Sequence, residues 1–274
     1  MTQIKNNGEK IITMRELERR RDFAINLCRD ACTIIKKDFK IGIEKKHKKD
    51  SSMDGATDIK INEMFIKEIR KEFPTHDILS EERSYLKNRS VIRWVCDPLD
   101  GTRVFSQGVP TSMISIAVVE IGVPLLGVVY DPFMDRMFSA IINNGARLNG
   151  ESIHVSSKKI IKEASVGISY WNGAQISLTN LHTELIEASS SVLMLGSIVY
   201  MGALVSCGEL DALIHPAKYP YDSAALSVII SEAGGTVTGI SGNKQKYDRS
   251  INGGVMTNRI LHNDLLDMIR KTNK

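Results

Sequence analysis

The segment from Trp94 to Thr102, WVCDPLDGT, constrains the fold of this chain more than any other feature of the sequence. Its first residues continue a short apolar run, which predicts a buried β-strand. Pro98 fixes one φ angle and lacks an N–H donor, so the strand is expected to end there. Gly101 allows a tight turn immediately afterwards. The sequence therefore predicts that two carboxylates, Asp97 and Asp100, lie at the end of a buried strand.

Two carboxylates at this spacing suit a hard divalent cation, because Mg²⁺ prefers oxygen ligands in octahedral geometry. The backbone N–H groups of Gly101 and Thr102 would then be available to a phosphate. The alternative is an ordinary turn, since Asp-Pro and Asp-Gly are common turn dipeptides. Other acids have equally plain alternatives: Glu81-Glu82 could be a surface turn, and Asp58 and Asp222 could be helix N-caps.

Composition is that of an ordinary globular protein, and its mild positive charge fits an anionic substrate. The chain has 274 residues, 42% of them hydrophobic and 25% charged, which allows one large α/β domain or two small ones. A net charge of +4 is too small to indicate nucleic-acid binding, so no nucleic-acid partner is expected. Four cysteines without C-x-x-C spacing predict free thiols in a reducing compartment. Neither a secretory signal nor a membrane span is visible, so a cytoplasmic protein without a membrane partner is expected.

Hydrophobic periodicity predicts two halves of different organisation. In the first, amphipathic helices at 14–37 and 58–72 precede strands at 112–120, 125–130, 137–142 and about 153–155. In the second, strands at 164–169, 191–195, 212–214 and 236–238 alternate with helices at 183–188, 197–207, 222–233 and 259–271. This pattern is typical of an α/β (α+β) protein. We expect residues 1–150 and 151–274 to form two halves of one continuous fold.

A lysine-rich segment at 36–49 contains Lys45-Lys46 and Lys48-Lys49 on either side of His47. It is interpreted either as a solvated loop or as an electropositive flap over an anionic substrate. The sequence leaves both alternatives open.

Several ordered motifs together resemble those of the inositol monophosphatase superfamily. The segment DPLDGT at 97–102, together with YDSAA at 221–225 and EAGG at 232–235, resembles its two signature motifs. Glu81-Glu82, Asp58 with the later Pro74, and Gly196-Ser197 fit further elements of the pattern. The resemblance implies a layered α/β/α/β/α sandwich, a homodimer, and Li⁺-sensitive hydrolysis of small phosphate monoesters with two or three Mg²⁺ ions.

The resemblance also implies roles for individual residues. The implied metal ligands are Glu81, Asp97, the Leu99 carbonyl, Asp100 and Asp222. The implied catalytic residues, which orient the attacking water, are Asp58, Glu81 and Thr102. The implied phosphate and substrate contacts are Asp100, Gly101, Thr102, Gly196, Ser197 and Asp222, with His215 as a hypothetical addition.

Departures from the family pattern bear on the substrate. His215 replaces a glutamate frequent in inositol-selective members and is either a substrate contact or a surface histidine. Tyr221 replaces a tryptophan, and the segment 218–222 is similar to that of histidinol-phosphate phosphatases. The expected substrate is an inositol phosphate or a related sugar or cyclitol phosphate. The alternatives are a 3′(2′),5′-bisphosphate nucleotidase, a histidinol phosphatase, a fructose-1,6-bisphosphatase and a non-catalytic phosphate-binding scaffold.

Overall fold

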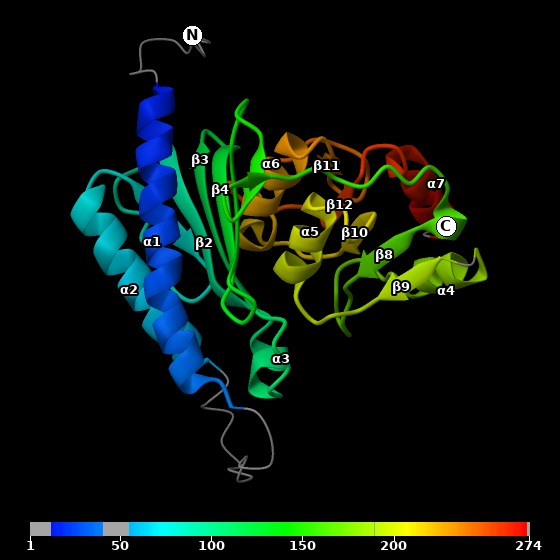
Figure 1. Ribbon diagram of the computed structural model, residues 1–274, viewed down its shortest axis with the longest axis horizontal. Helices are drawn as coiled ribbons and strands as arrows, with labels where there is room; N and C mark the ends of the chain where they lie inside the picture. Colours follow the sequence, from blue (N-terminus) through cyan, green and yellow to red (C-terminus); the bar gives the residue numbers. More distant parts are fainter. Residues whose placement is uncertain (1–11, 41–54, 189, 273–274) are drawn as a thin grey trace.

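The computed structural model describes residues 12–40, 55–188 and 190–272. It has five layers, in which two β-sheets alternate with three layers of helices (Figure 1). Helices α1 (Met14–Asp38) and α2 (Ala56–Glu72) cover the outer face of the first sheet. Helices α5 (Ile198–Ser206) and α6 (Ala224–Glu232) lie between the two sheets. The predicted α/β/α/β/α sandwich is therefore confirmed.

The first sheet has seven strands in sequential order. They are β1 (Asp77–Ser80), β2 (Ile92–Asp100), β3 (Met113–Glu120), β4 (Val123–Asp131), β5 (Arg136–Ile141), β6 (Ala146–Leu148) and β7 (Glu151–Ser152). Strands β1 and β2 are parallel, with Ser80 paired to Cys96, and all other neighbours are antiparallel. This register places Glu81, the residue after β1, beside the end of β2.

The second sheet has five strands in the order β11-β12-β10-β8-β9. Its strands are β8 (Ser165–Ile168), β9 (Ser191–Leu193), β10 (Ala212–His215), β11 (Thr236–Thr238) and β12 (Gly254–Thr257). Helices α4 (Thr179–Glu187) and α7 (His262–Thr272) pack on its outer face, opposite α5 and α6. Two short helices, α3 (Thr102–Ser106) and a 3₁₀ turn at Pro220–Asp222, border the candidate site.

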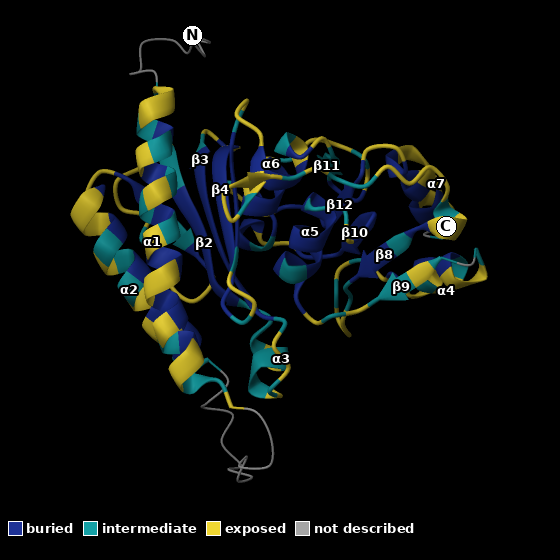
Figure 2. Ribbon diagram, in the orientation of Figure 1, coloured by how far each residue is buried: buried dark blue, intermediate teal, exposed yellow. Residues whose placement is uncertain are grey.

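The central helix layer is apolar on all sides because it contacts both sheets. Figure 2 shows α5 and α6 as almost entirely buried, in contrast to the half-exposed α1 and α2. One continuous hydrophobic cluster includes Val95 and Met113 of the first sheet and Leu213 and Met256 of the second. The first sheet ends at Ser152, two residues beyond the expected division at 150.

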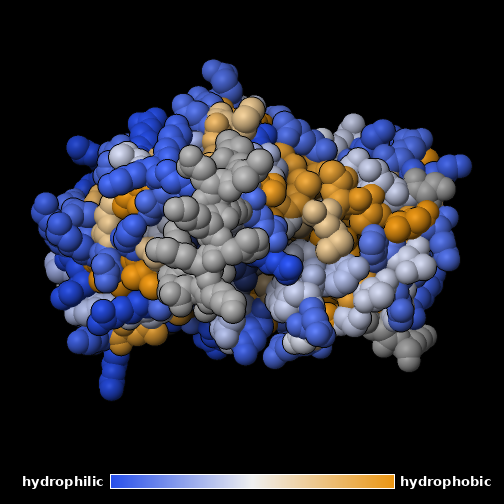
Figure 3. Space-filling model, turned by 90° about the horizontal axis from the view of Figure 1, so that it is seen from below, coloured by the Kyte–Doolittle hydropathy of each residue, from blue (hydrophilic) through white to orange (hydrophobic). Residues whose placement is uncertain are grey.

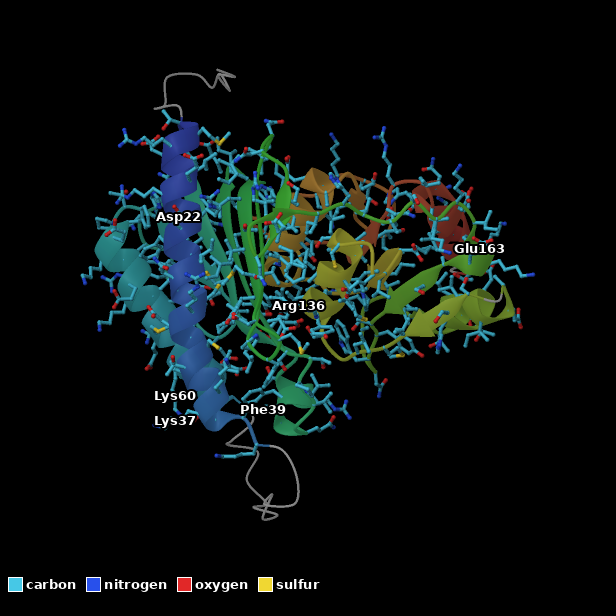
Figure 4. The ribbon with its side chains drawn as sticks, viewed as in Figure 1. Asp22, Lys37, Phe39, Lys60, Arg136 and Glu163 are labelled. Atoms are coloured by element: carbon cyan, nitrogen blue, oxygen red, sulfur yellow. The ribbon has the colours of Figure 1, made fainter. Side chains whose placement is uncertain are left out.

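A polar connection also joins the first sheet to the central helices. Arg136 lies between them (labelled in Figure 4) and bonds Asp131 at 3.1 Å and the Tyr200 hydroxyl at 3.0 Å. Asp131 has no exposed surface and also accepts hydrogen bonds from the N–H groups of Phe133 and Met134. This carboxylate is therefore fully satisfied within the protein.

The structure corrects two sequence expectations and adds one strand that the sequence did not predict. β2 does not end at Pro98 but continues to Asp100, because the pairing with β3 shifts register between Asp97 and Asp100 and the ladder needs no donor there. α2 begins after Gly55, so Asp58 lies inside the first turn. β12 was missed because its apolar run, Val255-Met256, is too short to register as a strand.

No helix among the residues that the structure describes is both long enough and apolar enough to cross a membrane. The four cysteines are free thiols, as expected.

Candidate active site

Carboxylates from both halves of the chain meet at one place. Asp97 and Asp100 end β2, and Asp222 ends the 3₁₀ turn before α6. One carboxylate oxygen from each of the three lies within 4.8 Å of the others. Asp97 is 1% exposed, whereas Asp100 and Asp222 are half-buried. The structure thus forms an acidic cluster, defined here as Asp97, Asp100 and Asp222.

The oxygens of this cluster suit a cation. Oδ1 of Asp97 accepts a hydrogen bond from the N–H of Leu99 at 3.0 Å, but its Oδ2 is buried with no partner in the protein. Oδ1 of the adjacent Asp58 is also buried without a partner. A buried carboxylate oxygen left unpaired is strongly unfavourable, and a hard divalent cation would satisfy it. The residues present therefore fit Mg²⁺.

The pKa shifts of the clustered acids also indicate a cation site. Burial raises the pKa of Asp97 well above its usual value, and the charges of Glu81, Asp100 and Asp222 raise it further. Burial and the charges of Asp100 and Glu81 act in the same way on the pKa of Asp222. A bound cation reverses this balance, since it favours the ionised form of every acid around it.

Glu81 lies beside the acidic cluster but is not one of its three members. Its N–H donates to the carbonyl of Cys96 at 3.3 Å, which continues the β1–β2 pairing. Glu81 as a whole residue is exposed. Its carboxyl group is nevertheless partly desolvated, and this desolvation together with the charge of Asp100 raises its pKa to about 7. Its role as a metal ligand stays a prediction.

Asp100 is held by the N-terminus of α5. The hydroxyl of Ser197 donates to Oδ2 of Asp100, and the N–H of Val199 donates to the same oxygen at 2.7 Å. Ser197 is 1% exposed, and its oxygen also caps α5 by accepting from the N–H of Tyr200. The structure therefore places Ser197 where it orients Asp100 rather than where it could reach a substrate. Gly196 precedes it with a φ of +78°.

Asp58 and Thr102 form a second polar pair next to the cluster. The hydroxyl of Thr102 lies 2.7 Å from Oδ2 of Asp58 and 3.3 Å from the Leu99 carbonyl. Gly101, at a φ of +86°, turns the chain from β2 into α3 and so brings Thr102 beside α2. Burial raises the pKa of Asp58 to about 6, against the opposing effect of the Thr102 hydrogen bond. At neutral pH, Asp58 is therefore mostly an acceptor.

His215 does not lie where a substrate contact would. It has no exposed surface, and both ring nitrogens face protein atoms, the N–H of Ala217 and the hydroxyl of Ser223. His215 is therefore neither a direct substrate contact nor a surface histidine, and both expectations were wrong. Lys45, Lys46, His47, Lys48 and Lys49 lie outside the described residues.

Sequence reasoning missed Tyr221 as a neighbour of the cluster. The residue is 8% exposed, and burial together with the charges of Glu81, Asp222 and Asp97 raises its pKa. Its ring stacks on Tyr219 at 5.3 Å between centroids. The signal in the sequence is its position immediately before Asp222.

These pKa shifts predict how pH affects the stability of the metal-free protein. Glu81, Asp58 and the cluster acids bind their protons at higher pH in the folded state than in the unfolded chain. The folded state therefore holds more protons on these acids than the unfolded chain above about pH 4, so their contribution to stability is lost as pH rises through about 6 for Asp58 and about 7 for Glu81, and at higher pH for Asp97 and Asp222. The buried histidines act in the opposite direction, because burial lowers the pKa of His76 to about 4 and that of His215 to about 3, whereas the unfolded chain protonates both below about pH 6.5. The decline should therefore be clearest above about pH 7, where both histidines are neutral in either state.

The measurement is the midpoint of thermal unfolding at several pH values, in chelator and in Mg²⁺. We expect a decline with pH in chelator that Mg²⁺ removes, because the cation compensates the ionised acids. The same slope under both conditions would contradict the electrostatic account of the site.

Comparisons with known proteins agree with the geometry. The chain matches the Inositol monophosphatase family over residues 16–273. It is 31% identical over 256 residues to a fructose-1,6-bisphosphatase/inositol-1-monophosphatase of Thermotoga maritima, covering 92% of this chain and 96% of that protein. It is also 31% identical over 229 residues to the Nus factor SuhB of Haemophilus influenzae, covering 79% and 83%. An inositol monophosphatase structure from Anabaena superposes with a TM-score of 0.82 at 25% identity, covering 93% and 96%. The chain belongs to the inositol monophosphatase family.

Proposed function

We propose that this protein is a Mg²⁺-dependent phosphomonoesterase that hydrolyses a small phosphate monoester with an activated water. The observation that carries the proposal is the convergence of the Asp97, Asp100 and Asp222 oxygens within 4.8 Å, with a buried oxygen of Asp97 left unpartnered. A phosphate dianion and this acidic cluster repel one another, so both require cations between them. A non-catalytic phosphate-binding scaffold is the alternative outside the enzyme class.

The proposed chemistry assigns separate tasks to the chain's residues. Bound divalent cations would lower the pKa of a water and neutralise charge on the phosphate. The hydroxyl of Thr102 donates its hydrogen bond to Asp58, which leaves the lone pairs of the Thr102 oxygen free to accept a hydrogen bond from a water and so orient it. Asp97, Asp100, Asp222, Glu81 and the Leu99 carbonyl are the proposed cation ligands, and the N–H groups of Gly101 and Thr102 are the proposed phosphate contacts. Positioning and charge neutralisation supply most of the catalysis in phosphoryl transfer.

We propose an inositol phosphate, or a related sugar or cyclitol phosphate, as the substrate. The proposal is supported by the family match and by relatives named inositol monophosphatase. His215, the hypothetical additional contact, is completely buried and does not favour a different leaving group. A nucleoside bisphosphate, histidinol phosphate and fructose 1,6-bisphosphate are the alternatives.

The test is phosphate release from a panel: inositol 1-phosphate, fructose 1,6-bisphosphate, histidinol phosphate and adenosine 3′,5′-bisphosphate. Each is measured in Mg²⁺, in Mg²⁺ with Li⁺, and in chelator. We expect Mg²⁺-dependent release that Li⁺ inhibits, with inositol 1-phosphate preferred by about tenfold in kcat/KM, equivalent to about 1.4 kcal/mol. No release from any compound in Mg²⁺ would refute the proposal.

Three further properties belong to the proposal. Free thiols support a reducing, cytoplasmic setting. A homodimer is supported by half-exposed apolar residues such as Trp171 and Met194, and Figure 3 shows an apolar area (orange) on one face of the molecule. Absence of a nucleic-acid partner also stays a prediction, and salt-dependent retention of the protein on RNA would contradict it.

A further inference from the structure

His215 occupies a site shaped for its ring. It ends β10 and is completely buried beneath the start of α6. The ring lies against Gly254 of the neighbouring strand β12, where an added Cβ would come within 2.2 Å of Nε2. Only glycine at 254 leaves room for the imidazole in this orientation.

The hydrogen bonds of His215 define which nitrogen carries its proton. The N–H of Ala217 donates to Nδ1 at 3.3 Å, so Nδ1 is the unprotonated nitrogen and Nε2 carries the hydrogen. Nε2 lies 3.2 Å from Oγ of Ser223 and therefore donates to it. Burial lowers the pKa of His215 to about 3, which keeps the ring neutral. The histidine is thus a fixed, uncharged donor to Ser223.

Ser223 is placed as an N-cap but does not act as one. It precedes α6 without any side-chain bond to the helix backbone. By contrast, Ser197 precedes α5, a helix of the same nine-residue length, and caps it through the N–H of Tyr200. A side-chain cap stabilises a helix, so its absence in α6 needs a reason. The reason visible in the structure is that the hydroxyl of Ser223 bonds His215 instead.

Asp222 lies between two residues that are fixed from opposite sides. Before it, the carbonyl of Tyr221 accepts from the hydroxyl of Ser115 in the first sheet at 3.3 Å. After it, Ser223 is bound by His215 of the second sheet. Asp222 is the one member of the acidic cluster contributed by the second half. These two bonds hold the residues on either side of it, and the N–H of Ser223 also donates to the carbonyl of Pro220 at 3.1 Å across the turn.

We propose that His215 is a positioning residue for Asp222, acting through the hydroxyl of Ser223 to fix this carboxylate against Asp97 and Asp100 for a divalent cation. The inference rests on the proposed function. Partners that orient a metal ligand in this way typically contribute about 10- to 100-fold to metal affinity.

The test measures the affinity of the purified full-length protein for Mn²⁺, by calorimetry and by the electron paramagnetic resonance of free Mn²⁺. His215→Leu removes the donor, and Ser223→Ala removes only the hydroxyl. We expect each to weaken Mn²⁺ binding about tenfold or more, and the double variant to be no weaker than either, because both break the same link. His215→Gln, which can present an N–H near the position of Nε2, should restore most of the affinity.

His262 offers a matched control. It is 6% exposed, and its two ring nitrogens each lie 3.1 Å from a threonine hydroxyl, those of Thr238 and Thr257, with no bond to the cluster. His262→Leu should lower the unfolding temperature while leaving Mn²⁺ affinity unchanged.

The outcomes separate the two proposals. Wild-type affinity in a folded Ser223→Ala or His215→Leu variant would overturn the role of His215, as would additive losses in the double variant. If His215→Leu fails to fold, Ser223→Ala alone decides. Wild-type protein that takes up no Mn²⁺ would overturn the proposed function, and the inference with it.

Discussion

Replacing Asp97 with asparagine should reduce phosphate release by roughly 10³-fold or more and, at the same time, make the metal-free protein more stable. Activity falls because the cluster loses a negative ligand at its centre. Metal-free stability rises because Asp97 is buried, has one unpartnered oxygen and is repelled by Glu81, Asp100 and Asp222. An isosteric neutral amide removes that repulsion. The opposite signs of the two effects are the signature of a ligand rather than of a structural acid.

Thermal unfolding in chelator and initial rates in Mg²⁺ check this prediction. Asp131→Asn is the control, because Asp131 is equally buried but paired with Arg136 and with two backbone N–H groups. The control should lose stability and keep most of its activity, provided that it folds. An Asp97→Asn protein that is less stable than wild type in chelator would show that Asp97 is a structural residue.

Thr102→Val should lower kcat by about 10²- to 10⁴-fold while leaving the fold intact. Valine nearly preserves the shape of threonine but removes the hydroxyl that links to Asp58 at 2.7 Å, so the oxygen proposed to orient a water is lost. Thr102→Ser keeps the hydroxyl and should keep most of the rate. Because Thr102 and Asp58 act as a pair, Asp58→Asn should cause a similar loss, and the double variant should be little worse than either.

The checks are steady-state kinetics and Mn²⁺ affinity of the same variants. We expect Mn²⁺ binding to change far less than kcat, since neither residue belongs to the closest cluster of carboxylates. Equal activity of the valine variant and wild type would exclude Thr102 from the reaction.

Local sequence was sufficient for much of the fold. The apolar periodicity of α1 and the antiparallel run of β3 to β5 depend on neighbours close in the chain, and both were predicted nearly to the residue. β12 was not, because its place in the sheet depends on pairing with β10 and β11, which are distant in sequence.

In the candidate site, too, the features that depend on nearby residues were predictable and those that depend on distant residues were not. That Asp97 and Asp100 share a strand end follows from spacing, but only the motif resemblance joined them to Asp222. The burial of His215 depends on the absence of a side chain at Gly254 and could not be inferred from residues near 215. The role of Ser197 was misassigned because its hydroxyl turns back to Asp100, a relation that the order of motifs does not reveal.

The division of the acidic cluster between the two halves has a consequence for synthesis of the protein. Asp97 and Asp100 leave the ribosome well before Asp222, so a nascent chain carries two of the three clustered acids before the third can close the site. Divalent cations should therefore add little to the early stages of folding and should favour only the completed molecule. Uptake of an ion would then report that the whole chain has assembled.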